Sequence, residues 1–203
     1  MNFFRVNGPE LWGDYGRLLA GGIARRGASE SAPFNLFRTG PFIPPISFPF
    51  RHVVVSQDFR IKIENAGLFS FTYQQVVKKH IAKLHWERWD LSADEPKKYP
   101  RGGEPEGYIL NRWHSRSTAK KMGDIWELVL EHGADTATKK IDGERRKRVM
   151  VNPSSWDGQH FFQSKTQGWK IVSAEGADWL RRNCPEWVTL DACIEWDPNA
   201  VDS

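Results

Sequence analysis

Histidine and cysteine are the residues of this sequence best suited to bind a metal or to attack a substrate. The six histidines are scattered along the chain, at positions 52, 80, 85, 114, 132 and 160. His80 and His85 are separated by five positions, which places them on different faces of a helix or of a strand. Cys184 and Cys193 match no common zinc pattern. The spacing therefore predicts no metal site, and we expect no cofactor.

A catalytic centre is not indicated either. Cys184 stands just before Pro185, at the end of an expected helix, whereas a reactive thiolate needs a helix N-terminus or a neighbouring base. The chain has no Gly-x-Ser-x-Gly sequence, no Gly-rich phosphate loop and no dinucleotide motif. The carboxylates at positions 94, 95, 104 and 106 fall in a charged loop, where solvated charge explains them. We expect a protein without catalytic activity.

One segment accounts for the formal net charge of +4. Residues 139–148, KKIDGERRKR, contain six basic and two acidic side chains, and the other 23 basic and 23 acidic residues balance. Arg and Trp are the side chains that most often anchor protein interfaces. The sequence therefore predicts a partner-binding surface, whose candidate residues are Arg145, Arg146, Arg148, Trp113 and Trp156.

The same charges also allow a nucleic-acid-binding module. Clustered cations contact phosphates, and nearby tryptophans can stack on bases. This alternative uses the basic segment 139–148 together with Arg112, Arg116, Lys120 and Lys121. It predicts affinity that falls steeply as salt is added.

Two segments with a similar pattern are expected to form the frame of the fold. Residues 52–77 and 169–194 each read as strand, helix and strand. In both, an apolar run ends in serine, Ser56 or Ser173, which is a good helix N-cap, and an acidic residue follows two positions later. A short sequence containing Gly or Pro then stops the helix. Duplication of one unit and ordinary recurrence of a common motif both remain open.

Two Asp-Gly pairs predict hairpin turns. Asp142-Gly143 lies between TATKKI and ERRKRVMV, the pattern of a two-residue turn between antiparallel strands. Asp157-Gly158 precedes the strand-like HFFQS, so we expect an antiparallel meander here.

The remaining segments are expected to be less regular. Residues 1–50 are rich in Pro, Gly and aromatics, and we expect limited regular structure there, with apolar side chains of 41–49 filling the core. Residues 92–107 are predicted to form a loop, and residues 197–203 a frayed tail. The stretch VVKKHIAKLHWERWDL from Val76 is predicted to be extended and to turn near Asp90, although Val77, Ile81 and Leu84 would also share one face of a helix.

The sequence HVVVSQDFRIKIENAGLFSFTYQQVV, with Val-Val-Ser before a helix that ends in Ala-Gly-Leu, resembles immunity-type proteins of bacterial polymorphic-toxin and contact-dependent competition systems. The resemblance covers residues 52–89 and extends to 169–194. The paired cysteine motifs that such proteins often carry are absent. The resemblance implies an antitoxin: a cytoplasmic toxin inhibitor that binds a cognate toxin protein and blocks it.

Length and composition agree with this class of protein. A chain of 203 residues suits one domain, and we expect a single α+β domain over residues 1–203, with antiparallel sheets and a few short helices. The N-terminus has no secretory pattern, no window has about 20 apolar residues, and two cysteines do not make a disulfide framework. We expect a cytoplasmic protein without membrane contact.

Overall fold

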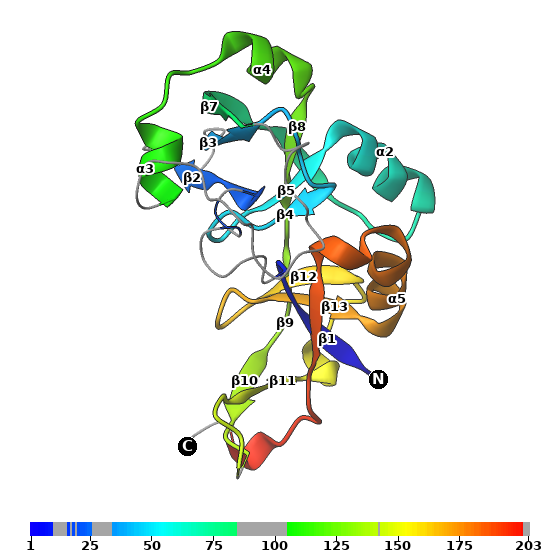
Figure 1. The fold of residues 1–203 in the computed structure, drawn as a ribbon. Helices are drawn as coiled ribbons and strands as arrows, with labels where there is room; N and C mark the ends of the chain where they lie inside the picture. Colours follow the sequence, from blue (N-terminus) through cyan, green and yellow to red (C-terminus); the bar gives the residue numbers. More distant parts are fainter. Residues whose placement is uncertain are drawn as a thin grey trace. The chain divides into compact units, whose positions relative to one another are not determined.

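The computed structural model describes residues 1–9, 16, 18, 20–25, 34–84, 105–141 and 143–200 of the chain (Figure 1). Contacts divide the chain into two compact units. Unit 1 contains Met1–Asn7, Ile63–Phe71 and Leu130–Ser203, and unit 2 contains Gly8–Lys62 and Thr72–Val129. Mostly antiparallel sheets and short helices confirm the α+β class. A single domain over the whole chain stays a prediction.

Unit 2 contains two sheets. The first has the strand order β4 (Ile46–Ser47), β5 (Val53–Ser56), β8 (Ile125–Val129) and β6 (Thr72–Gln75), with α2 (Gln57–Ala66) between β5 and β6 in sequence. The second has the order β2 (Ile23–Arg25), β3 (Asn35–Gly40) and β7 (Val77–Lys83), and its β3 and β7 are parallel. Two further helices, α3 (Pro105–Leu110) and α4 (Arg116–Lys121), pack against β7.

Unit 1 is built on a five-stranded sheet and a ribbon. The sheet has the order β14 (Thr189–Ala192), β1 (Phe3–Asn7), β13 (Lys170–Ser173), β12 (Phe161–Ser164) and β9 (His132–Ala134). Helix α5 (Ala174–Asn183) connects β13 to β14. The ribbon pairs β10 (Thr136–Lys139) with β11 (Arg148–Val151).

Both predicted strand–helix–strand segments are present, and they share one topology. The elements β5, α2 and β6 have the same lengths and spacing as β13, α5 and β14. In each segment a third strand lies between the two and is antiparallel to both: β8 in unit 2 and β1 in unit 1. The register also repeats, because Ser56 pairs with Ile125 as Ser173 pairs with Phe3, each at the first residue of the inserted strand. The similarity therefore extends beyond local pattern to strand pairing.

Serine side chains start the two long helices, as the sequence predicts. Ser56 Oγ accepts a hydrogen bond from the Phe59 backbone N–H at 3.3 Å, and Ser173 Oγ accepts one from that of Gly176, also at 3.3 Å. These bonds satisfy N–H groups that the first turn leaves free. At Gly176 a Cβ would lie 2.4 Å from a Val172 methyl, so only glycine lets α5 approach β13 this closely.

Apolar side chains form a separate core cluster in each unit. In unit 2 the cluster joins β3, β5, β7, β8 and α4, and its members are Phe34, Leu36, Val54, Val76, Ile81, Ala119, Met122 and Ile125. In unit 1 the cluster joins the sheet to the ribbon, and its members are Phe3, Ala134, Val149, Val151, Phe162 and Ile171. Ile46 is buried, as expected for an apolar residue of 41–49.

Arg38 is a fully buried cation inside unit 2. Its Nε donates to the Thr39 carbonyl at 3.0 Å, and its Nη2 donates to the carbonyls of Ala20 (2.9 Å) and Phe42 (3.1 Å). Burial lowers the pKa of Arg38 to about 9. The guanidinium therefore joins the main chain at Ala20 to the stretch from Thr39 to Phe42, and its charge is solvated by carbonyl oxygens.

The structure contradicts the predictions made from the sequence for both ends of the chain. Residues 1–50 hold four strands, β1 to β4, in place of limited regular structure, because pairing with distant strands overrides weak local preference. At the C-terminus, Asp197 forms an ion pair with Lys139 at 2.8 Å, and Pro198–Ala200 is a 3-10 turn, so no frayed tail begins at Asp197.

Loop predictions are corrected as well. Residues 92–104 lie outside the described residues, but α3 begins at Pro105, before the predicted loop end at Gly107. Proline and an acidic residue suit the first turn of a helix, and Glu106 follows Pro105. The predicted meander is wrong in its pairing: β11 pairs with β10, whereas β12 pairs with β13 and runs parallel to β9.

The predicted two-residue turn is also wrong in its register. A turn at Asp142-Gly143 would place Lys139 opposite Arg146, but Lys139 pairs with Arg148 and the ladder stops there. If the observed register continued beyond Lys139 and Arg148, the next pair would be Lys140 and Lys147. Like charges directly opposite each other destabilise a ladder, which explains why the pairing stops there. Asp142 itself lies outside the described residues.

Candidate functional site

The exposed basic side chains between β10 and β11 form the best candidate binding surface of unit 1. Lys140, Arg145, Arg146 and Lys147 are exposed, and none forms an ion pair within the described residues. We call these four residues the basic tip. The strands below it are fixed by pairing from Thr136 with Val151 to Lys139 with Arg148. A paired ribbon therefore presents four cations that no carboxylate of the described residues neutralises.

Arg148 has a structural role at the base of the ribbon. Its Nη1 lies 3.2 Å from Glu144 Oε1, and its Nη2 donates to the Ala192 carbonyl at 3.1 Å. The backbone N–H of Ile194 also donates to the Val149 carbonyl, at 2.8 Å. These bonds tie β11 to the end of β14, so Arg148 is less available to a partner than Arg145 and Arg146.

The two candidate tryptophans have different environments. Trp156 is half-buried: its indole N–H donates to the Gln159 carbonyl at 2.8 Å, and its ring meets Phe3 edge-on at 5.4 Å. Trp113 is 95% exposed and belongs to unit 2, whereas the basic tip belongs to unit 1. Arg145, Arg146, Arg148 and Trp156 thus share a unit, and Trp113 does not join them there.

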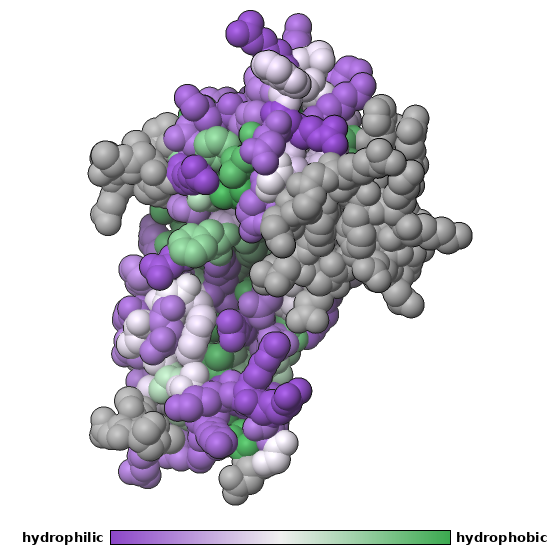
Figure 2. Space-filling model, turned by 60° about the vertical axis from the view of Figure 1, so that its left-hand side comes forward, coloured by the Kyte–Doolittle hydropathy of each residue, from purple (hydrophilic) through white to green (hydrophobic). Residues whose placement is uncertain are grey.

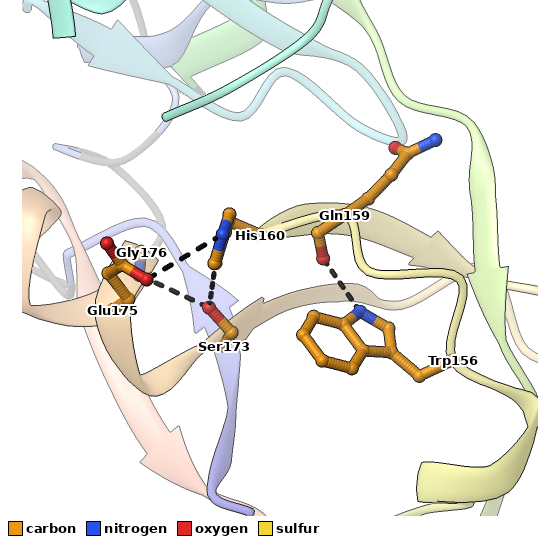
Figure 3. A network of polar contacts seen from close by, with 6 residues as sticks. All are labelled: Trp156, Gln159, His160, Ser173, Glu175 and Gly176. Carbon is orange, nitrogen blue, oxygen red and sulfur yellow. Dashed lines mark hydrogen bonds and ion pairs between the residues drawn. The ribbon is translucent and has the colours of Figure 1, made fainter. Parts of the chain in front are cut away.

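His160, Ser173 and Glu175 of unit 1 form a polar network (Figure 3). No pattern in the sequence predicts that these three residues meet. His160 Nδ1 lies 2.8 Å from Ser173 Oγ, and His160 Nε2 lies 3.7 Å from Glu175 Oε2. This set of residue types can activate a nucleophile in other proteins. Ser173 and Glu175 have a sequence signal as the N-cap and first-turn acid of a helix, but nothing in the sequence indicates that His160 joins them.

The geometry of this network indicates a structural role and not a catalytic one. Ser173 is only 4% exposed, so its hydroxyl is closed to a substrate. Its oxygen already accepts from Gly176, and its proton can go to His160. The contact between His160 and Glu175 is too long for a hydrogen bond, and Glu175 is largely exposed. The network therefore fixes the start of α5 against the residue that precedes β12.

Neither cysteine is arranged as a nucleophile. Cys184 is buried at the end of α5, and its Sγ contacts the Leu180 carbonyl at 3.4 Å. Burial raises the pKa of the Cys193 thiol to about 12, although Arg148 and Arg5 act in the opposite direction. The Cys193 thiol therefore stays protonated at neutral pH, and a protonated thiol is a weak nucleophile.

The histidines lie in separate environments. His52 Nδ1 is 2.5 Å from Glu127 Oε1, and its ring packs on Phe34. His80 and His114 are closer, with ring centroids 5.8 Å apart, but His114 Nδ1 accepts a hydrogen bond from the Ile81 backbone. Among the described residues, no group of three His, Cys, Asp or Glu side chains can hold a metal ion. His85 lies outside those residues.

In the described part of the chain, no helix has both the length and the apolar character needed to cross a bilayer. Comparison of the chain with models of protein families, with curated proteins and with solved structures finds no match.

Proposed function

We propose that this protein is a non-catalytic binding protein of the cytoplasm, and that the basic tip engages an acidic surface of a partner protein. The observation that carries the proposal is the set of four exposed cations, which no described carboxylate neutralises. The rest of unit 1 is acidic, because the unit as a whole has 11 basic and 13 acidic residues. A partner is therefore attracted to one end of the ribbon. Charge complementarity of this kind mainly raises the association rate.

The specific form of the proposal is an immunity protein that neutralises a cognate bacterial toxin. Its support is the resemblance of residues 52–89 and 169–194 to immunity proteins of bacterial competition systems. A basic ribbon suits this role, because active sites that bind metals or activate water are often lined with carboxylates. The tip would cover such a site and block substrate access.

The test is purification of the tagged full chain from its host, with and without nuclease treatment, followed by expression of the recovered partner alone. A single protein that survives nuclease treatment, binds in equal amount and is toxic without this chain is the expected result. An abundant partner without toxicity would contradict the immunity role and keep the binding role. Recovery of no protein at any salt concentration would contradict both the immunity role and the binding role.

Charge reversal then tests the surface. Arg145→Glu with Arg146→Glu should slow association with the purified partner by about tenfold or more at low salt. The matched control is Lys165→Glu with Arg182→Glu, which reverses two exposed cations of the same unit that are not part of the basic tip. Arg148 is left unchanged because it holds β11 to β14. Equal association rates for both double variants would contradict a role of the tip.

A further inference from the structure

The excess of basic residues lies on unit 2, not on the unit that carries the basic tip. Unit 2 contains 18 basic and 12 acidic residues, and unit 1 contains 11 and 13. The charge run at 139–148 is thus balanced within its own unit. The more basic partner surface has to be sought on unit 2.

The segment from α3 to α4 concentrates this charge. Residues 107–123 contain four basic side chains and no acidic one. Arg112, Arg116, Lys120 and Lys121 are all exposed. Figure 2 shows mostly hydrophilic side chains at its upper end, which is the end where Figure 1 draws α4. The carboxylate that follows α4, Asp124, accepts a hydrogen bond from Gln75 at 3.1 Å.

Strand β7 adds a further cation beside this segment. Ala82 of β7 bridges to His114, and the Tyr108 hydroxyl lies 3.3 Å from the Lys83 carbonyl. The Arg112 guanidinium stacks on the Tyr108 ring at 4.5 Å. The Lys83 backbone and the Arg112 guanidinium therefore both contact Tyr108, and the Lys83 side chain is exposed.

Trp113 follows Arg112 directly and precedes Arg116 by three residues, and its ring is open to solvent. It is 95% exposed and makes no hydrogen bond or ring contact among the described residues. A tryptophan that only fills space would be buried, as Trp187 is in unit 1. Both faces of the Trp113 indole are available for stacking.

The segment that directly follows Trp113 is hydrogen-bonded to β7. His114 Nδ1 accepts from the Ile81 N–H at 3.0 Å, and the Ser115 N–H donates to the Ile81 carbonyl at 2.8 Å. Ser115 Oγ in turn caps α4 by accepting from the Thr118 N–H. Burial, then His80 and Arg116, lower the pKa of His114, which keeps its Nδ1 an acceptor at neutral pH. Trp113 therefore directly precedes a stretch of backbone that is bonded to β7.

We propose that unit 2 binds single-stranded nucleic acid, with Trp113 stacking on a base and Lys83, Arg112, Arg116, Lys120 and Lys121 contacting the phosphates on either side. We call these six residues the Trp113 surface. A duplex hides its base faces, whereas an unpaired strand offers a flat ring beside each phosphate. An acidic protein would use the cations and leave the open indole unused. This surface is separate from the basic tip and does not depend on the function proposed for it.

The test uses the full chain and three labelled probes: an oligothymidine of about ten nucleotides, an oligouridine of the same length, and a polyglutamate peptide. Fluorescence anisotropy gives each affinity at several salt concentrations. Both oligonucleotides should bind more tightly than polyglutamate. Tighter binding of oligouridine than of oligothymidine would identify RNA as the preferred ligand. Trp113→Ala should weaken oligonucleotide binding by about 5- to 150-fold and leave polyglutamate unchanged. Trp113→Phe should retain most of the affinity.

Two further variants separate stacking from charge. Arg116→Ala with Lys120→Ala should reduce the salt slope of oligonucleotide binding by about 1.4, because each phosphate contact to a single strand contributes about 0.7. Arg145→Ala with Arg146→Ala on the basic tip should leave the slope unchanged. Equal binding of Trp113→Ala and the unaltered protein, or a preference for polyglutamate, would overturn the proposal. The failure of this surface would leave the partner-binding test of the basic tip intact.

Discussion

Phe50 occupies a backbone conformation that suits glycine. Its φ is +55°, the single positive value among the described non-glycine residues, and its side chain is 79% exposed. The His52 N–H donates to the Pro49 carbonyl at 3.1 Å, so Phe50 lies inside a tight turn. A side chain with a Cβ is strained in this region by about 1 kcal/mol.

At the residue scale, this strain predicts an unusual order of stability. Phe50→Gly should be more stable than Phe50→Ala by about 1 kcal/mol, because glycine alone removes the clash of the Cβ. Both variants lose the same exposed ring, so the comparison isolates the backbone. Urea unfolding of the two proteins measures the difference. A higher stability of the alanine variant would show that φ at this position is not strained.

The Cys193 thiol gives a second prediction at this scale. Its pKa is about 12 in the folded protein, well above the ordinary value of 9.0, so almost no thiolate is present at about pH 8. In a Cys184→Ser background, alkylation of Cys193 by iodoacetamide should be about a hundredfold slower in the folded protein than in urea. Because folding favours the protonated thiol, Cys193 should stabilise the fold at neutral pH and cease to do so as pH rises towards 12. Rapid alkylation in native buffer would contradict the raised pKa.

At the scale of elements, the two capped helices offer a matched comparison. Ser56→Ala should cost about 1 kcal/mol, the usual value of an N-cap hydroxyl. Ser173→Ala should cost more, because His160 also loses its hydrogen-bond partner. Ser70→Ala, at an exposed position without a cap, is the control. Urea unfolding measures all three, and equal losses for Ser56 and Ser173 would argue against a stabilising contact of His160.

At the scale of the whole molecule, two units with opposite net charge carry two candidate surfaces. The basic tip and the Trp113 surface share no residue and belong to different units. The triple variant Arg145→Glu, Arg146→Glu and Trp113→Ala should therefore bind oligothymidine as weakly as Trp113→Ala alone. It should associate with the partner protein as slowly as the Arg145→Glu, Arg146→Glu double variant alone. Anisotropy with oligothymidine and association kinetics with the purified partner measure the two effects. Weaker oligonucleotide binding caused by the tip variants alone would indicate one shared binding surface.

The sequence by itself determined the local elements of this fold. Apolar runs that end in Ser56 and Ser173 gave the two strand–helix–strand segments, and the extended pattern after Val77 gave β7. These signals are local because φ and ψ preferences, helix caps and side-chain periodicity act over a few residues. The basic segment was also visible, because charge is read directly from residue types.

Only the tertiary structure decided which strands meet and which side chains stay exposed. Phe3 pairs with Ser173 across almost the whole chain, and nothing near either residue indicates that partner. Trp113 and Trp187 are the same residue type, yet one is open to solvent and the other is buried. Strand pairing and burial depend on the free energy of non-local contacts, which leaves no short-range mark in a sequence. Trp113 and its neighbouring cations can be read from the sequence, but the division of charge between two units and the exposure of Trp113 became visible only when those contacts were known.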